Sequence, residues 1–391
     1  MDCKPKQRMD IEKLKASFIQ MYQSEPLLVR SPGRINILGE HTDYNEGFVM
    51  PAAIDKAVYI AIAKRSDQEL HLYAAEFKDA HNVSLQALKP SEKGWPNYIL
   101  GVVDELQKRG YHIGGFDLYI DGDVPAGAGL SSSAAVECAT AFALDQLFEL
   151  SVSRMDLALI GQQAEHTFAG VNCGIMDQFA SVFGRKDEAV LLDCRSMTYR
   201  YVPLHMDGYQ LVLINSKVKH ALADSAYNKR RAQCEQGVAW IKTVYPDVNS
   251  LRDATLEMLD QLVKPNDEDV YVKCRYVVEE NLRVLKAAEM LNSGEPGGLG
   301  QLMFETHEGL SKAYEVSCAE LDFLVDAVRN NPDVLGARMM GGGFGGCTLN
   351  IIRSEAIAGL TREISAAYLQ EFGREPEVYI VKTDNGTATL A

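Results

Sequence analysis

A polar segment near the beginning of the chain gathers side chains of the kind that hold sugars. Residues 31–47 read SPGRINILGEHTDYNEG, so that Arg34, Glu40, His41, Asp43 and Asn45 lie between three glycines. Short acceptors beside a forked guanidinium donor suit a ligand with many hydroxyl groups, because such a ligand is held by hydrogen bonds with few apolar contacts. The alternative is a solvated turn with local salt bridges. We therefore expect a loop that binds a polar ligand or only closes a turn.

A second segment, residues 123–135, reads DVPAGAGLSSSAA and leads into a predicted helix from about 131 to 148. Gly127 and Gly129 permit close approach to the backbone, and three serines follow where the helix begins. The free N–H groups and the positive dipole end of a helix start bind phosphate well. No lysine follows the glycines, so the Walker pattern is missing. The alternative to an anion site is a turn with an ordinary serine cap.

Two further segments carry glycines or acids. Residues 340–347, MGGGFGGC, contain a formal G-x-G-x-x-G, but a strand is predicted after it, and a dinucleotide fold requires a helix there. These glycines indicate tight backbone packing, against a ligand loop or within a hairpin. Glu165 lies late in a predicted helix and Asp177 follows a glycine-punctuated turn, so both carboxylates can face one cleft. The alternative is a pair of surface acids.

The elements that must position these residues form a mixed α+β pattern. A helix is predicted from Asp10, where Ile11, Leu14, Phe18 and Met21 recur at helical spacing. Further strands are predicted at 27–30, 47–54, 57–64, 69–75, 116–120, 189–194, 199–204, 209–215, 347–352 and 377–382. Helices are predicted at 95–107, 131–148, 155–168 and 355–369, and helices dominate from about 222 to 329. The pattern predicts two domains, residues 1–205 and 206–391.

Composition narrows the class of protein. The 391 residues are 47% hydrophobic and 24% charged, which excludes disorder as the main state. The net charge of −15 disfavours nucleic acid as a partner, and no apolar run approaches the roughly 20 residues that cross a bilayer. The first ten residues lack the apolar core of a secretory signal. Eight scattered cysteines without a C-x-x-C pair are typical of reduced thiols, so we expect a cytoplasmic protein.

In this order the four segments resemble the motifs of the GHMP small-molecule kinases, and among these the galactokinase family. Gly33 to Tyr44 resembles the signature G-R-x-N-x-x-G-E-H-x-D-Y, and Gly127 to Ser133 is similar to the phosphate loop G-x-G-L-S-S-S. Cys173 to Phe179, C-G-I-M-D-Q-F, resembles the segment that carries the catalytic aspartate. Gly341 to Gly346 resembles the third motif, so that the likeness covers nearly the whole chain.

The resemblance implies a two-domain GHMP kinase fold. The N-terminal domain would have the ribosomal-S5-domain-2-like fold, the C-terminal domain would be α+β with an antiparallel sheet, and the active site would lie in the cleft between them. The implied reaction transfers the γ-phosphoryl group of ATP to the C1 hydroxyl of α-D-galactose, with Mg²⁺ as cofactor. The implied enzyme is a monomer whose partners are galactose and ATP.

The resemblance also assigns roles to single residues. Asp177 would be the general base, and Arg34 would keep it ionised and stabilise the phosphoryl group in transfer. Sugar binding would fall to Glu40, His41, Thr42, Asp43, Gly174 and Tyr227. The phosphates would be wrapped by Gly127, Ala128, Gly129, Leu130, Ser131, Ser132 and Ser133, with magnesium held by Ser133 and Glu165. Trp95 would lie near the nucleotide base, or else would be a core tryptophan.

Two other functions are compatible with the motifs. An N-acetylgalactosamine kinase, or another sugar kinase of the superfamily, shares most of them, although the intact G-E-H-T-D-Y run favours galactose. A sensor that binds galactose and ATP without turnover is the other alternative. Such relatives have lost residues of the serine loop, whereas Ser131 to Ala134 is complete here and both Arg34 and Asp177 are present.

Overall fold

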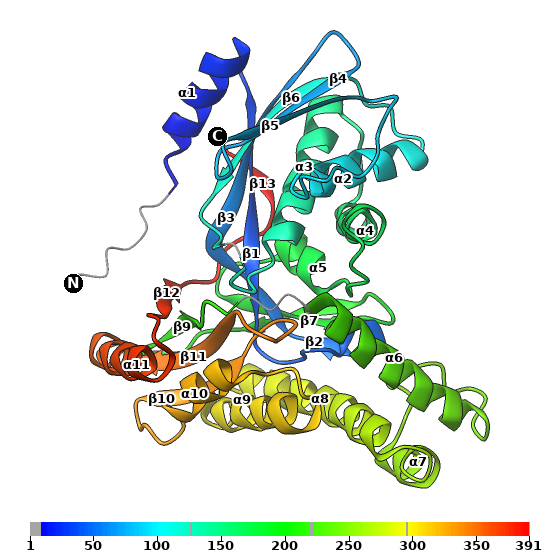
Figure 1. Cartoon of the computed structure of the whole chain (residues 1–391), viewed down its shortest axis with the longest axis vertical. Helices are drawn as coiled ribbons and strands as arrows, with labels where there is room; N and C mark the ends of the chain where they lie inside the picture. The colour runs from blue at the N-terminus through cyan, green and yellow to red at the C-terminus, as the bar shows by residue number, and fades with distance from the viewer. Residues whose placement is uncertain (1–8, 126, 219–222, 295, 391) are drawn as a thin grey trace.

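The largest element of the fold is a six-stranded sheet with the order β13-β1-β3-β6-β4-β5, drawn in the upper half of Figure 1. The computed structural model describes residues 9–125, 127–218, 223–294 and 296–390. All neighbouring strands are antiparallel except β4 and β6. The strands are β1 (Leu27–Asn36), β3 (Pro51–Lys64), β4 (Glu69–Ala74), β5 (Asp79–Ser84), β6 (Phe116–Gly122) and β13 (Ala388–Thr389).

Helices cover both faces of this sheet. On one face α1 (Ile11–Tyr22) buries Leu14 and Phe18 against the sheet. Four helices lie over the other face in Figure 1: α2 (Asn97–Lys108), α3 (Ser132–Phe148), α4 (Arg154–Ala164) and α5 (Met176–Phe183). Helix α3 is buried along most of its length, because its alanines let it lie close to β1 and β3. It is the rigid element behind the glycine–serine loop.

The second half of the chain forms a fully antiparallel sheet with the order β10-β11-β9-β12. Its strands are β9 (Tyr209–Asn215), β10 (Val334–Met339), β11 (Cys347–Arg353) and β12 (Glu377–Val381). The helices of this half are α6 (Ala223–Lys242), α7 (Leu256–Met258), α8 (Glu268–Asn292), α9 (Leu299–Glu308), α10 (Ala319–Asp326) and α11 (Ile357–Phe372). A small sheet of β2 (Phe48–Val49), β7 (Glu188–Asp193) and β8 (Tyr199–Pro203) completes the strands of the described chain.

The two halves share one apolar core. The largest cluster of buried side chains joins Val29 and Ile35 of β1 to Leu211 of β9 and Leu349 of β11. The C-terminal segment strengthens this connection, because β13 pairs with β1 after the chain has left the second sheet. A cleft between the halves therefore has walls that are anchored in a common core.

The α+β architecture with an antiparallel second sheet is confirmed, whereas the division at residue 205 stays a prediction. One expectation was wrong: Arg34 lies in strand β1 and not in a loop. The strand continues through Pro32 and Gly33 by means of a bulge, where its register on β3 shifts. Residues 1–8 and Ala126, which belong to predicted segments, lie outside the described residues. No helix in the described ranges is long and apolar enough to cross a membrane.

Candidate active site

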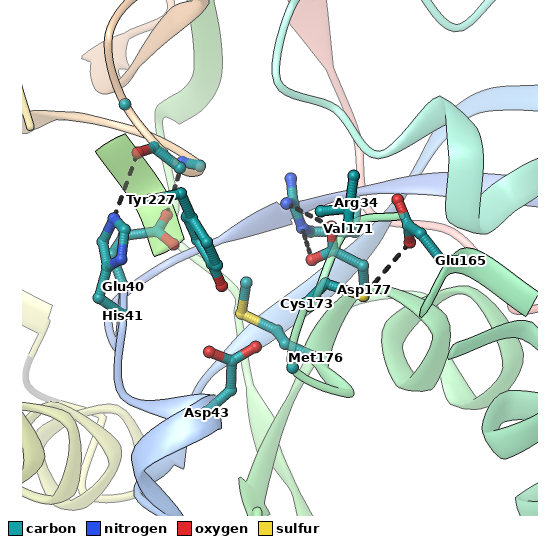
Figure 2. Close-up of a pocket in the computed structure, with 14 residues that line it drawn as sticks. Arg34, Glu40, His41, Asp43, Glu165, Val171, Cys173, Met176, Asp177 and Tyr227 are labelled. Atoms are coloured by element: carbon teal, nitrogen blue, oxygen red, sulfur yellow. Dashed lines mark hydrogen bonds and ion pairs between the residues drawn. The ribbon is translucent and has the colours of Figure 1, made fainter. Parts of the chain in front are cut away.

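Three of the four predicted segments meet at one cavity of about 210 Å³ (Figure 2). The fourth segment, the glycine–serine loop of residues 127–133, contacts the cavity wall from outside through Arg34 and Asp177. The wall consists of Arg34, Glu40, His41, Asp43, Glu165, Val171, Cys173, Gly174, Met176, Asp177, Tyr227, Gly341, Gly342 and Gly343. Eight of the site residues predicted from the sequence thus line one cavity, although Arg34 and Tyr227 are 193 positions apart in the chain.

An arginine–aspartate pair lies on the cavity wall. Arg34 Nε donates to Asp177 Oδ1 at 2.7 Å and Nη2 donates to Oδ2 at 2.9 Å, so the guanidinium holds the carboxylate with both arms. Burial alone would lower the pKa of Arg34, but the carboxylates of Asp177 and Glu40 raise it above its ordinary value. The guanidinium is therefore charged, while the Asp177 side chain keeps 27% of its surface exposed for a ligand.

The glycine–serine loop is attached to this pair. Arg34 Nη1 donates to the carbonyl of Gly129 at 2.6 Å, and the Arg34 backbone N–H donates to the carbonyl of Leu130 at 3.2 Å. Ser131 has a left-handed backbone with φ 57° and its hydroxyl donates to Asp177 Oδ2. The same residue precedes α3 without capping it through its side chain. The Ser131 hydroxyl thus binds the aspartate in place of capping the helix, and the anion site stays a prediction.

A second cluster of polar groups surrounds Glu165, which lies in the turn of π-helix at Glu165–Ala169. Gln178 Nε2 donates to Glu165 Oε2 at 2.8 Å and to the buried Glu137 at 2.9 Å, and the Ser133 hydroxyl also hydrogen-bonds to Glu165. Burial raises the pKa of Glu165, and the charge of Asp177 raises it further. The two predicted magnesium ligands are thus neighbours.

The oxygen donors of Ser133 and Glu165 fit magnesium only together with a phosphate ligand. Among the described residues no group of three or more histidine, cysteine or acidic side chains is arranged to hold a metal. Ser133 and Glu165 offer one hydroxyl and one carboxylate, which are hard oxygen donors. Magnesium takes one or two carboxylates and completes its octahedron with water and phosphate oxygens.

The loop of residues 39–48, here called the sugar loop, presents neutral and charged groups to the cavity. Burial lowers the pKa of His41 to about 4, so its ring is neutral at pH 7. Its Nε2 lies 3.3 Å from the carbonyl of Gly342, which can only accept, so Nε2 carries the proton and Nδ1 is left to accept from Tyr44 at 2.7 Å. Burial, and then the charge of Asp177, raises the pKa of Asp43 to about 7.

Gly174 has a steric reason to be glycine. A Cβ at this position would overlap the carboxylate of Asp43, although the two residues are far apart in sequence. The backbone of the segment before α5 therefore closes directly over Asp43. This contact joins the sugar loop to the segment that carries Asp177.

Several predicted residues lie outside the cavity wall. The hydroxyl of Thr42 donates to the carbonyls of Gly39 at 2.9 Å and Phe48 at 2.6 Å, so it shapes the sugar loop from within. Trp95 lies just before α2, and its indole N–H donates to Asp79 at 3.0 Å. The roles of both in ligand binding stay predictions. The same holds for Gly127, Ala128 and Ser132, which belong to the glycine–serine loop.

The third glycine motif connects the other two. The N–H of Gly341 donates to Glu40 at 2.9 Å, and a Cβ on Gly341 or Gly346 would come within van der Waals contact of the glycine–serine loop. Cys173 and Met176 of the wall lie inside the C-G-I-M-D-Q-F motif but were not singled out. No signal in the sequence pointed to Val171.

Three family models match the chain over these segments. The galactokinase galactose-binding signature matches residues 16–64, the GHMP kinases N terminal domain matches 97–185, and the GHMP kinases C terminal domain matches 286–369. The galactokinase of Roseiflexus sp. is 40% identical over 383 residues, which cover 98% of each chain. The chain belongs to the galactokinase family. The galactokinase of Clostridium acetobutylicum is also 40% identical, with 97% of this chain and 98% of that one covered.

A solved galactokinase structure agrees with this assignment. The structure of Lactococcus lactis galactokinase complexed with galactose superposes with a TM-score of 0.94 at 34% identity, and covers 97% of this chain and 100% of that one. The part of the chain that matches the galactose-binding signature contains Arg34 and the acids of the sugar loop. The N-terminal model contains the glycine–serine loop and Asp177, and the C-terminal model contains the third glycine motif.

Proposed function

We propose that this chain transfers the γ-phosphoryl group of ATP to the C1 hydroxyl of α-D-galactose, and releases α-D-galactose 1-phosphate and ADP. As a member of the galactokinase family the chain is an ATP-dependent sugar kinase. The observation that carries the proposal is the two-armed Arg34–Asp177 pair, which lies between the sugar loop and the glycine–serine loop. An acceptor hydroxyl and a γ-phosphate can therefore meet beside one carboxylate and one guanidinium.

In this mechanism Asp177 accepts the proton of the C1 hydroxyl as the oxygen bonds to the γ-phosphorus. The bond between that phosphorus and the bridging oxygen breaks, and ADP leaves with the electron pair. Arg34 holds the Asp177 carboxylate in place through two hydrogen bonds and lies close enough to the loop to stabilise charge on the phosphoryl oxygens. Since phosphoryl transfer proceeds through a loose transition state, positioning contributes more than nucleophile activation.

Ser133 and Glu165 would hold magnesium together with the phosphates of ATP. The ion, when bound, neutralises charge on the phosphate oxygens. The contribution of the chain is to hold the Glu165 carboxylate in place through Gln178 and Ser133. The glycine–serine loop from Gly127 to Ser133 would wrap the phosphates with backbone N–H groups, and Trp95 would lie near the base.

Galactose would be held by the acids and the neutral imidazole of the sugar loop. Glu40 and Asp43 are acceptors for hydroxyl groups, and His41 and Tyr227 line the same cavity. We place the enzyme in the cytoplasm, because the seven cysteines of the described residues are unpaired, as is usual in a reducing compartment. The resemblance to the galactokinase family leads us to propose a monomer. The charge of −15 leaves nucleic acid an unfavourable partner.

Galactose binding is expected to strengthen as the pH rises through 7. The pKa of Asp43 is about 7, so its carboxyl is protonated below this pH and ionised above it. An ionised carboxylate accepts hydrogen bonds from sugar hydroxyls better than the acid does. The dissociation constant should therefore fall about tenfold between pH 6 and pH 8 in calorimetric titrations. In Asp43→Asn the binding should be weaker and lose this dependence; a pH profile that survives in the variant would exclude Asp43 as its source.

The position of the transferred phosphate tests the proposed reaction. We expect ³¹P NMR of the product to show a sugar phosphate that couples to the anomeric proton, because Asp177 is assigned to the C1 hydroxyl. A phosphate on C6 would contradict the assignment of the acceptor. Competition between galactose and N-acetylgalactosamine in the same assay measures the specificity at C2.

A further inference from the structure

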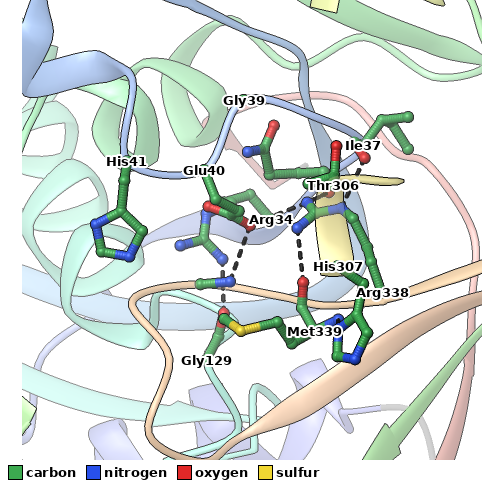
Figure 3. Close-up of polar contacts among 12 residues, drawn as sticks. Arg34, Ile37, Gly39, Glu40, His41, Gly129, Thr306, His307, Arg338 and Met339 are labelled. Carbon is green, nitrogen blue, oxygen red and sulfur yellow. Dashed lines mark hydrogen bonds and ion pairs between the residues drawn. The ribbon is translucent and has the colours of Figure 1, made fainter. Parts of the chain in front are cut away.

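Arg338 is a fully buried arginine that belongs to none of the predicted sites (Figure 3). It lies on β10, and its guanidinium is in contact with the sugar loop and the end of β1. Nε donates to the carbonyl of Ile37 at 2.8 Å and Nη1 donates to that of Met339 at 2.7 Å. Nη2 donates to the carbonyl of Asn36 and to Oε1 of Glu40, the latter at 2.9 Å.

The two oxygens of Glu40 have different surroundings. Oε1 receives the Arg338 guanidinium at 2.9 Å and the backbone N–H of Gly341, also at 2.9 Å. Oε2 has no hydrogen-bond donor among the described residues, although the Glu40 side chain is only 2% exposed and lines the cavity. Because Glu40 lines the cavity, Oε2 is available to accept a hydrogen bond from a ligand there.

The backbone around Glu40 is also held from the second half of the chain. The N–H of Gly39 donates to Glu280 of α8 at 2.8 Å, and the hydroxyl of Tyr276 donates to the carbonyl of Glu40 at 3.1 Å. With the backbone fixed on both sides, the remaining freedom is the side-chain torsion of Glu40. Arg338 and Gly341 remove that freedom, because two donors at one oxygen define where the other oxygen points.

We propose that Arg338 is a positioning residue for the sugar site: together with the N–H of Gly341 it fixes Oε1 of Glu40 and thereby aims Oε2 at a hydroxyl of the sugar. This inference rests on the proposed function, because it names the ligand of that same cavity. A purely structural ion pair would leave no reason for one oxygen to face the cavity without a donor. Buried ion pairs often add little to stability, and fixing a geometry is a better-attested role.

The first test is Arg338→Lys. A lysine keeps the charge but cannot serve four acceptors in the geometry of a guanidinium. By calorimetry without nucleotide we expect the dissociation constant for galactose to rise about tenfold or more, as for the loss of a charge-assisted hydrogen bond. The affinity for Mg-ATP should stay within about twofold of the wild type. The matched control is Arg353→Lys on the neighbouring strand, where Arg353 pairs with Asp333 and touches no cavity residue.

The second test, Glu40→Gln, does not depend on Arg338→Lys being able to fold. With Arg338 and Gly341 both donating, the amide oxygen of the new side chain must take the place of Oε1. The NH₂ group then faces the cavity, where it can donate but not accept. We expect galactose affinity to fall at least about tenfold while the melting temperature changes by only a few degrees. If Glu40 were free to turn, the glutamine would offer its oxygen to the sugar and the affinity would be kept.

The outcomes separate this inference from the proposed function. A folded Arg338→Lys protein that binds galactose like the wild type would overturn the positioning role, and so would full affinity in Glu40→Gln. Equal losses of galactose and Mg-ATP affinity would also overturn it, because they would indicate a general disturbance of the cleft. A wild-type protein that fails to bind galactose would overturn the proposed function and the inference with it.

Discussion

The Asp177→Asn variant is expected to lose about 10²–10⁴-fold in kcat, the usual contribution of a general base. Asparagine is close to aspartate in shape but cannot accept the C1 proton. It also gives Arg34 only one oxygen in place of the two that now bind Nε and Nη2 at 2.7 and 2.9 Å. Galactose binding should change little, because the sugar loop supplies its own acceptors. Steady-state kinetics with calorimetry of galactose binding measure both quantities.

The matched control is Asp384→Asn. Asp384 accepts a hydrogen bond from Arg30 of strand β1 at 2.8 Å, so it pairs with an arginine of the same strand that carries Arg34. Asp384 is not part of the cavity wall. Its kcat should stay within about twofold of the wild type, as for surface substitutions in general. A kcat of Asp177→Asn near that of the control would remove Asp177 as the base, and would leave positioning by Arg34 as the main source of catalysis.

The Glu165→Ala variant is expected to need far more magnesium. Substitution of a residue that only supports a metal ligand typically lowers metal affinity by about 10–100-fold. Loss of a ligand itself should lower metal affinity by at least about as much. The magnesium concentration for half-maximal rate should therefore rise about tenfold or more, while galactose affinity stays unchanged. The cause is local, because Glu165 is the carboxylate that Ser133 and Gln178 hold beside the glycine–serine loop.

The control for this variant is Glu105→Ala. Glu105 is a buried glutamate of α2 that pairs with Lys108 at 3.0 Å and is not part of the wall of the active-site cavity. The Glu105→Ala variant should be less stable than the wild type, but its magnesium requirement should be unchanged. An unchanged magnesium requirement in Glu165→Ala would mean that Glu165 serves only the packing around Gln178.

Local patterns predicted much of the fold. Strand β11 and helix α11 follow from apolar runs of the right period, and the helix predicted from about 131 to 148 is α3. Strand β10 was missed. It contains Gly336 and Arg338, and neither residue indicates a buried strand by itself. Gly336 is needed because its backbone lies against that of Gly300, a contact between distant segments that no local pattern reveals.

The site was predictable to the extent that its residues lie in short motifs. Arg34, Glu40, Asp43 and Asp177 belong to such motifs, and the structure brings all four to one cavity. Interactions between motifs were not predictable. The bond from Ser131 to Asp177 depends on a left-handed turn, and the contact of Asp43 with Gly174 depends on how two distant segments of the first half of the chain pack.

The same limit explains why Arg338 was missed. A buried arginine is tolerated only where acceptors surround it, and three of the four acceptors here come from Asn36, Ile37 and Glu40, roughly 300 positions earlier in the chain. Its position two residues before the third glycine motif gave no hint of a role at the sugar loop. Such a role becomes visible only in the folded chain, where Arg338 of β10 lies against the end of β1.

The proposed reaction is tested most directly by release of ADP in a coupled assay with ATP, magnesium and a panel of galactose, glucose, N-acetylgalactosamine and arabinose. We expect turnover with galactose at a kcat of about 1–100 per second, and much lower kcat/KM for the other sugars. Galactose that raises the melting temperature without any release of ADP would contradict it, and would identify the chain as a sensor of sugar and nucleotide.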